Sequence, residues 1–138
     1  KMSKSDNADS YISMKDDNET IQRKVKKAYS DPTRIYKHQA GNPSKEGCNV
    51  YHLHTYFTEK EMLEKIQLQC SNATIGCVQC KSILSDSINS IVEPFRERRE
   101  KLSDSYVYDV LAHGRMKAKE SSQKVISEVR KAIGLRMF

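Results

Sequence analysis

The segment CVQCKSILSDSINSIVEPFRERREKL, residues 77–102, decides the fold class of this chain. Its apolar residues Leu84, Ile88, Ile91 and Phe95 recur every three or four positions. This spacing places them on one face of an α-helix. Pro94 lies inside the pattern and predicts a kink or an interruption, because proline lacks the amide proton that a helix interior needs. The segment therefore predicts a long helix with one buried face.

The chain on both sides of this segment shows the same helical periodicity. Gly114 is expected to end one helix and Gly134 another, because glycine favours the backbone conformation that follows a helix. Thr58 is expected to cap a helix together with Glu61. The expected helices cover residues 19–29, about 50–57, 59–70, 106–112 and about 125–133. No segment indicates a strand, so the fold class is predicted to be all-α, with a polar, mobile loop and linker over 1–18 and a helical domain over 19–138.

The composition limits the classes of protein to which the chain can belong. The chain has 138 residues and a net charge of +6, and residues 95–138 hold eleven Lys or Arg against six Asp or Glu. Such a concentration of positive charge favours a polyanionic partner, although a basic surface can also serve only solubility. No apolar run approaches the ~20 residues that a membrane span requires. We therefore expect a soluble, cytoplasmic protein with nucleic acid as a plausible partner and no contact with a membrane.

The chain begins with Lys1-Met2-Ser3-Lys4-Ser5, which places two ammonium groups and two hydroxyls close together. When a carboxylate attacks the α-phosphorus of ATP, negative charge builds up on the departing pyrophosphate. Lysines on a loop that closes over the nucleotide would stabilise this state more than the ground state. The motif therefore suits a polyphosphate, with Lys1 and Lys4 as the candidate catalytic residues and Ser3 and Ser5 as hydrogen-bonding partners of the nucleotide; the alternative is a solvated basic tail.

The four cysteines of the chain are Cys48, Cys70, Cys77 and Cys80, in the pattern C-x21-C-x6-C-x2-C. Stable disulfides are rare in the cytosol, which makes metal ligation the leading interpretation. Thiolates alone can hold either zinc or an iron-sulfur cluster, and the spacing does not separate the two metals. Buried or oxidised thiols are the third interpretation. His52 and His54 lie near Cys48 and are interpreted as ordinary helix residues.

Several blocks of the sequence resemble one family along essentially the whole chain. The opening Lys-Met-Ser-Lys-Ser matches the signature loop of class I aminoacyl-tRNA synthetases, and residues 12–31 resemble the segment that follows it in tryptophanyl and tyrosyl enzymes. The blocks at 41–43, 48–51, 76–81, 93–99 and 114–118 are similar to bacterial tryptophanyl-tRNA synthetases and argue against the tyrosyl enzymes. Asp6-Asn7-Ala8 replaces the proline that usually follows the signature.

The resemblance implies the C-terminal helical bundle of a class I synthetase, behind the signature loop and without the family's Rossmann nucleotide-binding fold. It implies ATP with Mg²⁺, tryptophan and tRNA(Trp) as partners of a homodimeric full-length enzyme, and no adenylate formation by this piece alone. In a subset of the family, the cysteine pattern holds a 4Fe-4S cluster beside the anticodon-binding surface. The iron interpretation rests on this resemblance, with zinc as the alternative.

A basic cluster follows Pro94 and is the candidate for contact with tRNA. Arg96, Arg98 and Arg99 could bind phosphates or stack on an anticodon base, or they could form a solvated face paired with acidic neighbours. A rival from another class is a stand-alone helical iron-sulfur or zinc module that binds RNA without catalysing ligation.

Overall fold

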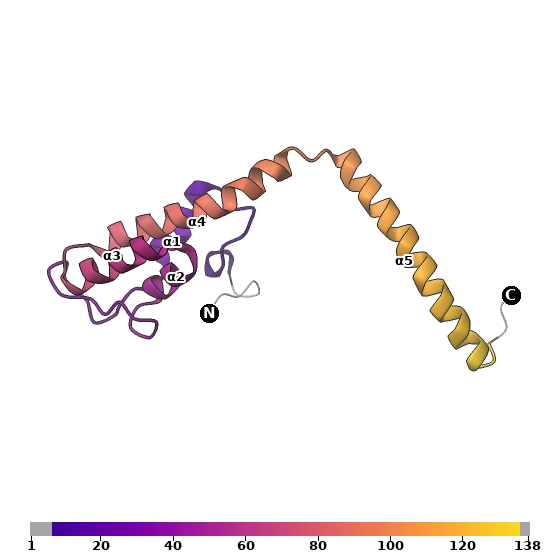
Figure 1. The fold of residues 1–138 in the computed structure, drawn as a ribbon, viewed down its shortest axis with the longest axis horizontal. Helices are drawn as coiled ribbons and strands as arrows, with labels where there is room; N and C mark the ends of the chain where they lie inside the picture. Colours follow the sequence, from indigo (N-terminus) through magenta and orange to yellow (C-terminus); the bar gives the residue numbers. More distant parts are fainter. Residues whose placement is uncertain (1–6, 136–138) are drawn as a thin grey trace. The chain divides into compact units, whose positions relative to one another are not determined.

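The computed structural model describes residues 7–135, and within this range every regular element is helical. A short 3₁₀ turn, η1, covers Ala8–Ser10. Five α-helices follow: α1 (Asn18–Lys27), α2 (Asn49–Phe57), α3 (Lys60–Ser71), α4 (Cys77–Glu100) and α5 (Asp104–Ala132) (Figure 1). The all-α prediction is confirmed for this part of the chain. No helix in it is long and apolar enough to cross a membrane.

The chain divides into two compact units, one ending at Glu97 and the other beginning at Arg98. The first unit has a core made by one face of α4 and the apolar residues of α1, α2 and α3. The core contains Ile21, Val25, Cys48, Val50, Tyr51, Ile66, Leu84, Ile88 and Val92. The predicted face of α4 is therefore partly confirmed, because Leu84 and Ile88 are buried whereas Ile91 and Phe95 are exposed.

Two helices continue through residues that were expected to stop or bend them. α4 includes Pro94 and runs on to Glu100, and α5 passes through Gly114, so the predicted helix end at His113-Gly114 is wrong. One glycine costs a helix only about 1 kcal/mol relative to alanine, which its neighbours can offset. α5 ends at Gly134 as predicted: its φ is +72°, and Leu135 N–H donates to Arg130 O at 2.9 Å. This bond is typical of a Schellman motif.

The start of α3 differs from the prediction. Glu59 precedes the helix and no side chain caps it, so the expected capping box of Thr58 and Glu61 is absent. The Thr58 hydroxyl instead contacts His54 Nδ1 at 2.7 Å and Ser87 Oγ at 3.2 Å. A local partner in α2 and a distant one in α4 therefore take up the Thr58 hydroxyl, and sequence spacing could not reveal the distant one.

The segment before α1 packs more closely than expected. Ile12 packs against the core, and Asp9 pairs with Lys27 of α1 at 2.6 Å. Asp16 pairs with the buried Lys24 at 2.7 Å. Opposite charges on α1 thus hold residues 9–16 against the helix, whereas their polar composition alone predicted no packing.

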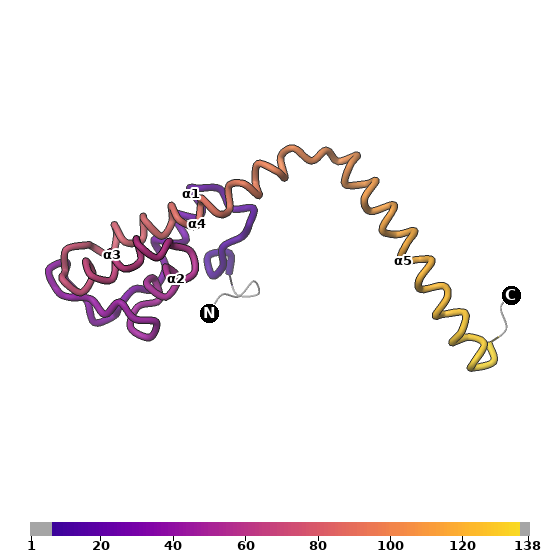
Figure 2. Tube along the Cα trace, in the orientation of Figure 1, coloured from indigo at the N-terminus to yellow at the C-terminus, as the bar shows by residue number. Residues whose placement is uncertain are grey.

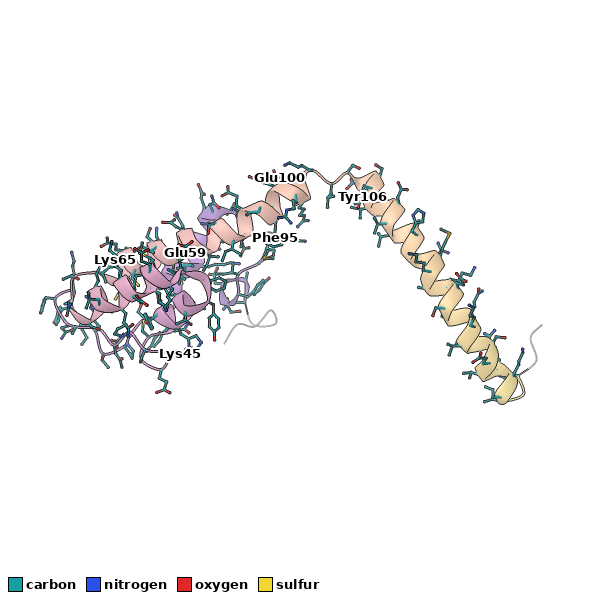
Figure 3. All side chains as sticks on the ribbon, viewed as in Figure 1. Lys45, Glu59, Lys65, Phe95, Glu100 and Tyr106 are labelled. Carbon is teal, nitrogen blue, oxygen red and sulfur yellow. The ribbon has the colours of Figure 1, made fainter. Side chains whose placement is uncertain are left out.

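The connection from α1 to α2, residues 28–48, contains no helix and passes the ends of α3 and α4 (Figure 2). Gly41 N–H donates to Cys70 O at 3.0 Å and Arg34 donates to Ile75 O at 2.9 Å, which fixes this path. In the second unit, α5 buries no residue, and its side chains project all around it (Figure 3).

Candidate metal centre

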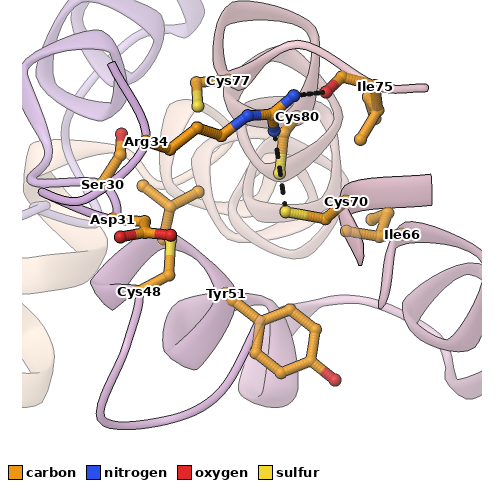
Figure 4. Close-up of a pocket in the computed structure, with 11 residues that line it drawn as sticks. Ser30, Asp31, Arg34, Cys48, Tyr51, Ile66, Cys70, Ile75, Cys77 and Cys80 are labelled. Carbon is orange, nitrogen blue, oxygen red and sulfur yellow. Dashed lines mark hydrogen bonds between the residues drawn. The ribbon is translucent and has the colours of Figure 1, made fainter. Parts of the chain in front are cut away.

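The four cysteines lie at the ends of three helices and line one cavity. Cys48 immediately precedes α2, Cys70 lies in the last turn of α3, and Cys77 and Cys80 occupy the first turn of α4. All four are free thiols. Figure 4 shows them around a common space, with Arg34 extending across it. The helix ends therefore bring together residues that are up to 32 positions apart, Cys48 and Cys80.

The remaining walls of the cavity are mostly apolar. Val50, Tyr51, Ile66 and Ile75 line it and are all buried. Asp31 also lines the cavity, but its carboxylate accepts hydrogen bonds from Thr33 N, Thr33 Oγ1 and Asn42 N at 2.6–2.8 Å. Burial works to raise the pKa of Asp31, yet these hydrogen bonds hold it below its usual value. Asp31 thus acts as an anchor for the loop.

The surroundings of the thiols oppose the formation of unbound thiolates. Burial, followed by the nearby Cys48, Cys70 and Cys77, raises the pKa of Cys80 to about 12. Burial also raises the pKa of Cys70, against which the positive charge of Arg34 acts. Four thiolates in such a place repel one another, so their charge requires a cation for compensation.

Arg34 is the cationic side chain that reaches into the cavity. Its Nη1 donates to Cys70 Sγ at 3.7 Å, and its Nη2 donates to the carbonyl oxygens of Lys37 at 2.7 Å and Ile75 at 2.9 Å. Its Nε is buried and, among the described residues, has no hydrogen-bond partner. A buried donor without a partner is costly, so it points to an acceptor that protein atoms do not supply.

Three observations test whether these residues suit a thiolate-bound metal group. The donor set consists of four cysteines and is of the soft type that zinc and iron-sulfur clusters require. The buried Arg34 Nε has no acceptor within residues 7–135. A Cβ placed on Gly41 would lie 2.5 Å from Cys70 Sγ, so only glycine leaves that sulfur its space. The residues present therefore fit such a group in their chemistry.

The side-chain positions do not amount to a finished metal site. Within residues 7–135, no three His, Cys, Asp or Glu side chains stand close enough together to hold a metal ion as they are. Ligation by all four thiols thus requires their side chains to move together inside the cavity. The metal interpretation from the sequence stays a prediction, and so does the choice between iron-sulfur and zinc.

His54 is a core residue beside this cavity, as the sequence interpretation held. It is fully buried, and its Nδ1 contacts Thr58 Oγ1 at 2.7 Å while its Nε2 lies 3.2 Å from Cys80 O and 3.4 Å from Cys80 Sγ. Burial lowers the pKa of His54, which favours the neutral imidazole. The ring therefore links α2 to the first turn of α4.

The other predicted site residues either lie outside the described part of the chain or are not among the residues that line this cavity. Lys1, Ser3, Lys4 and Ser5 lie outside the described residues. Arg96 is half-buried and donates to Asp16 O and Asn18 Oδ1, both at 2.5 Å, so its guanidinium is engaged within the chain. Arg98 and Arg99 are exposed near the end of α4. Arg96 thereby joins α4 to the segment that follows the opening motif.

Sequence reasoning missed Arg34 and Asp31 as parts of the site. The short spacing of Asp31 and Thr33 fits a turn in which an aspartate binds backbone two residues on, which was a usable signal. Arg34 gave none, because its contact with Cys70 spans 36 positions and depends on the course of an irregular loop.

The comparison with known families decides what kind of protein this is. The model of the family described as tRNA synthetases class I (W and Y) matches residues 1–93. The chain belongs to this family. The match includes the opening motif and all four cysteines of the cavity.

The relatives of this synthetase chain include several proteins named tryptophan–tRNA ligase. The tryptophan–tRNA ligase of Aquifex aeolicus (strain VF5) is 38% identical over 123 residues, which are 87% of this chain and 31% of that protein. The tryptophan–tRNA ligase of Thermotoga maritima is 33% identical over 138 residues, covering 98% of this chain and 41% of that protein. The enzyme of that name from Clostridium longisporum is 33% identical over the whole of this chain and 40% of its own length. The chain thus spans about a third of the length of the curated relatives it matches.

Proposed function

We propose that this chain works as part of a tryptophan–tRNA ligase, which activates tryptophan with ATP and transfers it to tRNA(Trp). The observation that carries the proposal is the likeness to proteins of that name over 87–100% of the chain. The family model covers both tryptophanyl and tyrosyl synthetases, so the proposed specificity for tryptophan rests on the tryptophan–tRNA ligases named above and on the cysteine blocks of the sequence.

The opening motif supplies the chemistry of the first step in this proposal. Lys1 and Lys4 would neutralise the charge that builds up on pyrophosphate as it leaves ATP, and Ser3 and Ser5 would hold its oxygens by hydrogen bonds. Mg²⁺ would accompany the nucleotide. A homodimer and a cytoplasmic location belong to the same proposal.

The helical part would read the tRNA. Arg98 and Arg99 are exposed and carry charge suited to phosphate contacts. The hydrogen bonds of Arg96 to Asp16 O and Asn18 Oδ1 give it a structural task, so a contribution to tRNA binding would require it to leave them. Because Arg98 and Arg99 are exposed whereas Arg96 is half-buried, we place more weight on Arg98 and Arg99 for contacts with phosphates.

The four cysteines would hold a 4Fe-4S cluster, with zinc as the alternative. The supporting observations are the shared cavity, the thiolate-only donor set and the space that Gly41 leaves beside Cys70 Sγ. When bound, the group would cross-link three helix ends and supply no redox chemistry to ligation. Tyr51, Ile66 and Ile75 would exclude water from it, because all three are buried at the cavity wall.

The exchange of pyrophosphate tests the enzymatic proposal directly. We expect the full-length protein to incorporate labelled pyrophosphate into ATP when tryptophan is present, and not when tyrosine replaces it. Replacing Lys4 by alanine should lower the exchange rate about a hundredfold, since one preorganised charge at the leaving group is lost.

The matched control is Lys15→Ala, which removes the same charge from an exposed position. Its exchange rate should equal that of the unchanged protein. A full-length protein without tryptophan-dependent exchange would contradict the proposal and favour the rival, a stand-alone RNA-binding module.

Replacing Cys77 by serine tests the metal group. After anaerobic reconstitution with iron and sulfide, the unchanged chain should show broad absorbance at about 400 nm, which arises from thiolate-to-iron charge transfer. Cys77→Ser should lose most of this absorbance and should melt at a lower temperature, because one of the four ligands is gone. Exchange activity of the full-length variant should fall less than its tRNA affinity.

The control for this variant is Val78→Ser, which introduces serine next to Cys77 at a position that is 75% exposed. It should retain the absorbance. A colourless chain that binds one equivalent of zinc would support the alternative metal, and a chain that binds neither would contradict both.

A further inference from the structure

Arg34 is held in an unusual position for an arginine. Its side chain runs from an irregular loop into the cavity of the four cysteines, where Cys70 Sγ lies 3.7 Å from Nη1 (Figure 4). Its Nη2 is bound to two main-chain carbonyls, Lys37 O and Ile75 O, so the guanidinium cannot swing out to solvent without losing both bonds. The loop thus aims a fixed positive charge at the thiols.

Some N–H donors of Arg34 have no good acceptor among the described residues, and an anion in the cavity would supply one. A guanidinium has five N–H donors. In Arg34, Nη2 donates to the carbonyl oxygens of Lys37 and Ile75. The buried Nε–H has no partner among the described residues, and the sulfur contact of Nη1 is long. Both of these nitrogens therefore have donors that a sulfur-bound group in the cavity would satisfy.

The net charge of a thiolate-bound metal also points to Arg34 as its partner. Four thiolates bring more negative charge than Zn²⁺ neutralises, so a thiolate-only site retains a net negative charge in an apolar cavity. Such a charge is costly unless a cation compensates it. The ionisable side chains that line the cavity besides the cysteines are Arg34, Asp31 and Tyr51, and only Arg34 is a cation.

We propose that Arg34 is a positioning residue that compensates the charge of the thiolate-bound metal, donating from Nη1 and Nε to its sulfurs. The inference rests on the proposed metal group and goes beyond it, because it assigns a cationic partner to the four ligands. Partners of metal ligands commonly affect metal affinity by about 10- to 100-fold. Arg34 should therefore strengthen metal binding without being a ligand.

The test uses Co²⁺ as a probe, because its charge-transfer absorbance reports thiolate ligation and its affinity can be measured by chelator competition. The whole 138-residue chain is used, reduced and under anaerobic conditions. Arg34→Met should bind Co²⁺ about 10- to 100-fold more weakly than the unchanged chain. Its thiolate-to-cobalt absorbance at saturation should be unchanged, because all four cysteines are still present.

Two further variants separate charge compensation from folding. Arg34→Lys retains the positive charge but loses the planar fork, so it should recover part of the affinity. Lys37→Met removes an exposed cation from the same loop and should bind Co²⁺ like the unchanged chain. The far-UV circular dichroism of the metal-free variants shows whether Arg34→Met still folds. If it does not, Arg34→Lys carries the test.

The outcomes distinguish this inference from the proposed function. If the unchanged chain binds no Co²⁺ through its thiols, the metal proposal fails and the role of Arg34 fails with it. If the unchanged chain binds Co²⁺ and the folded Arg34 variants bind it with equal affinity, only the role of Arg34 is overturned. A weaker affinity with an altered charge-transfer intensity would also overturn it, because a ligand would then have been lost.

Discussion

Replacing Asp16 by alanine is expected to lower the free energy of unfolding of the first unit by about 3–5 kcal/mol. Asp16 Oδ2 lies 2.7 Å from Lys24 Nζ, and the two side chains are only 14% and 5% exposed. Removal of the carboxylate leaves an ammonium group buried, with the Tyr11 ring as its remaining neighbour at 4.9 Å from the centroid. A buried charge without its partner is among the most destabilising changes a chain can undergo.

Urea denaturation followed by circular dichroism measures this loss. The double variant Asp16→Ala, Lys24→Met should recover much of it, since the uncompensated charge is removed as well. The control is Asp9→Ala: this carboxylate also binds α1, through Lys27 and Arg23, but its ion pairs are exposed, so the loss should be much smaller. Equal losses for Asp16→Ala and Asp9→Ala would contradict the prediction.

The Asp16→Ala variant should also affect the segment that connects the opening motif to α1. Asp16 lies between the opening motif and α1, and its main-chain oxygen accepts the hydrogen bond from Arg96. The Asp16 side chain also accepts from Ser13 N at 2.8 Å. Asp16→Ala keeps the main-chain oxygen but loses the bonds of the carboxylate to Ser13 N and Lys24, so the segment that connects the motif to the helical unit should loosen.

Replacing Leu84 by alanine is expected to cost about 2–5 kcal/mol of stability. Leu84 is fully buried at the centre of the α4 face that packs on α1, α2 and α3, and it lies one turn after Cys80. Truncation removes buried methyl groups and leaves a cavity that the surrounding helices can fill only in part. The change should also weaken retention of a metal, because the first turn of α4 carries two of the cysteines.

Denaturant titration of the reduced chain gives the stability, and Leu68→Ala is the matched control. Leu68 lies on α3 and is 65% exposed, so the same truncation there should change stability by less than about 0.5 kcal/mol. A Leu84→Ala variant as stable as Leu68→Ala would mean that α4 does not pack as described.

The sequence was sufficient for the fold class and for most helices. Apolar spacing in residues 77–102 predicted α4, and Gly134 predicted the end of α5, because both signals act within a few residues of the chain. The residues that failed as signals were Gly114 and Thr58, and Pro94 did not end α4. Each was judged by its local preference. The cost of one glycine inside a helix, about 1 kcal/mol, can be offset by the rest of the helix, and the Thr58 hydroxyl contacts Ser87 on α4 instead of capping α3.

The candidate site likewise has a part that the sequence predicted and a part that it did not. The spacing of the four cysteines predicted a shared metal site. The structure places all four around one cavity, whereas ligation of a metal stays a prediction. Arg34 could not be found in this way. Its sulfur and carbonyl contacts depend on the course of residues 28–48, which no periodicity describes.

By itself, the sequence determined the helical class and the family, and it predicted four cysteines as ligands for a metal. These follow from residue type and spacing, which the chain carries wherever it folds. Only the tertiary structure decided that Arg34 reaches the thiols, that Asp16 and Lys24 form a buried pair and that Arg96 binds the chain itself. Such contacts join distant residues, and their energies depend on burial, which exists only once the helices have packed.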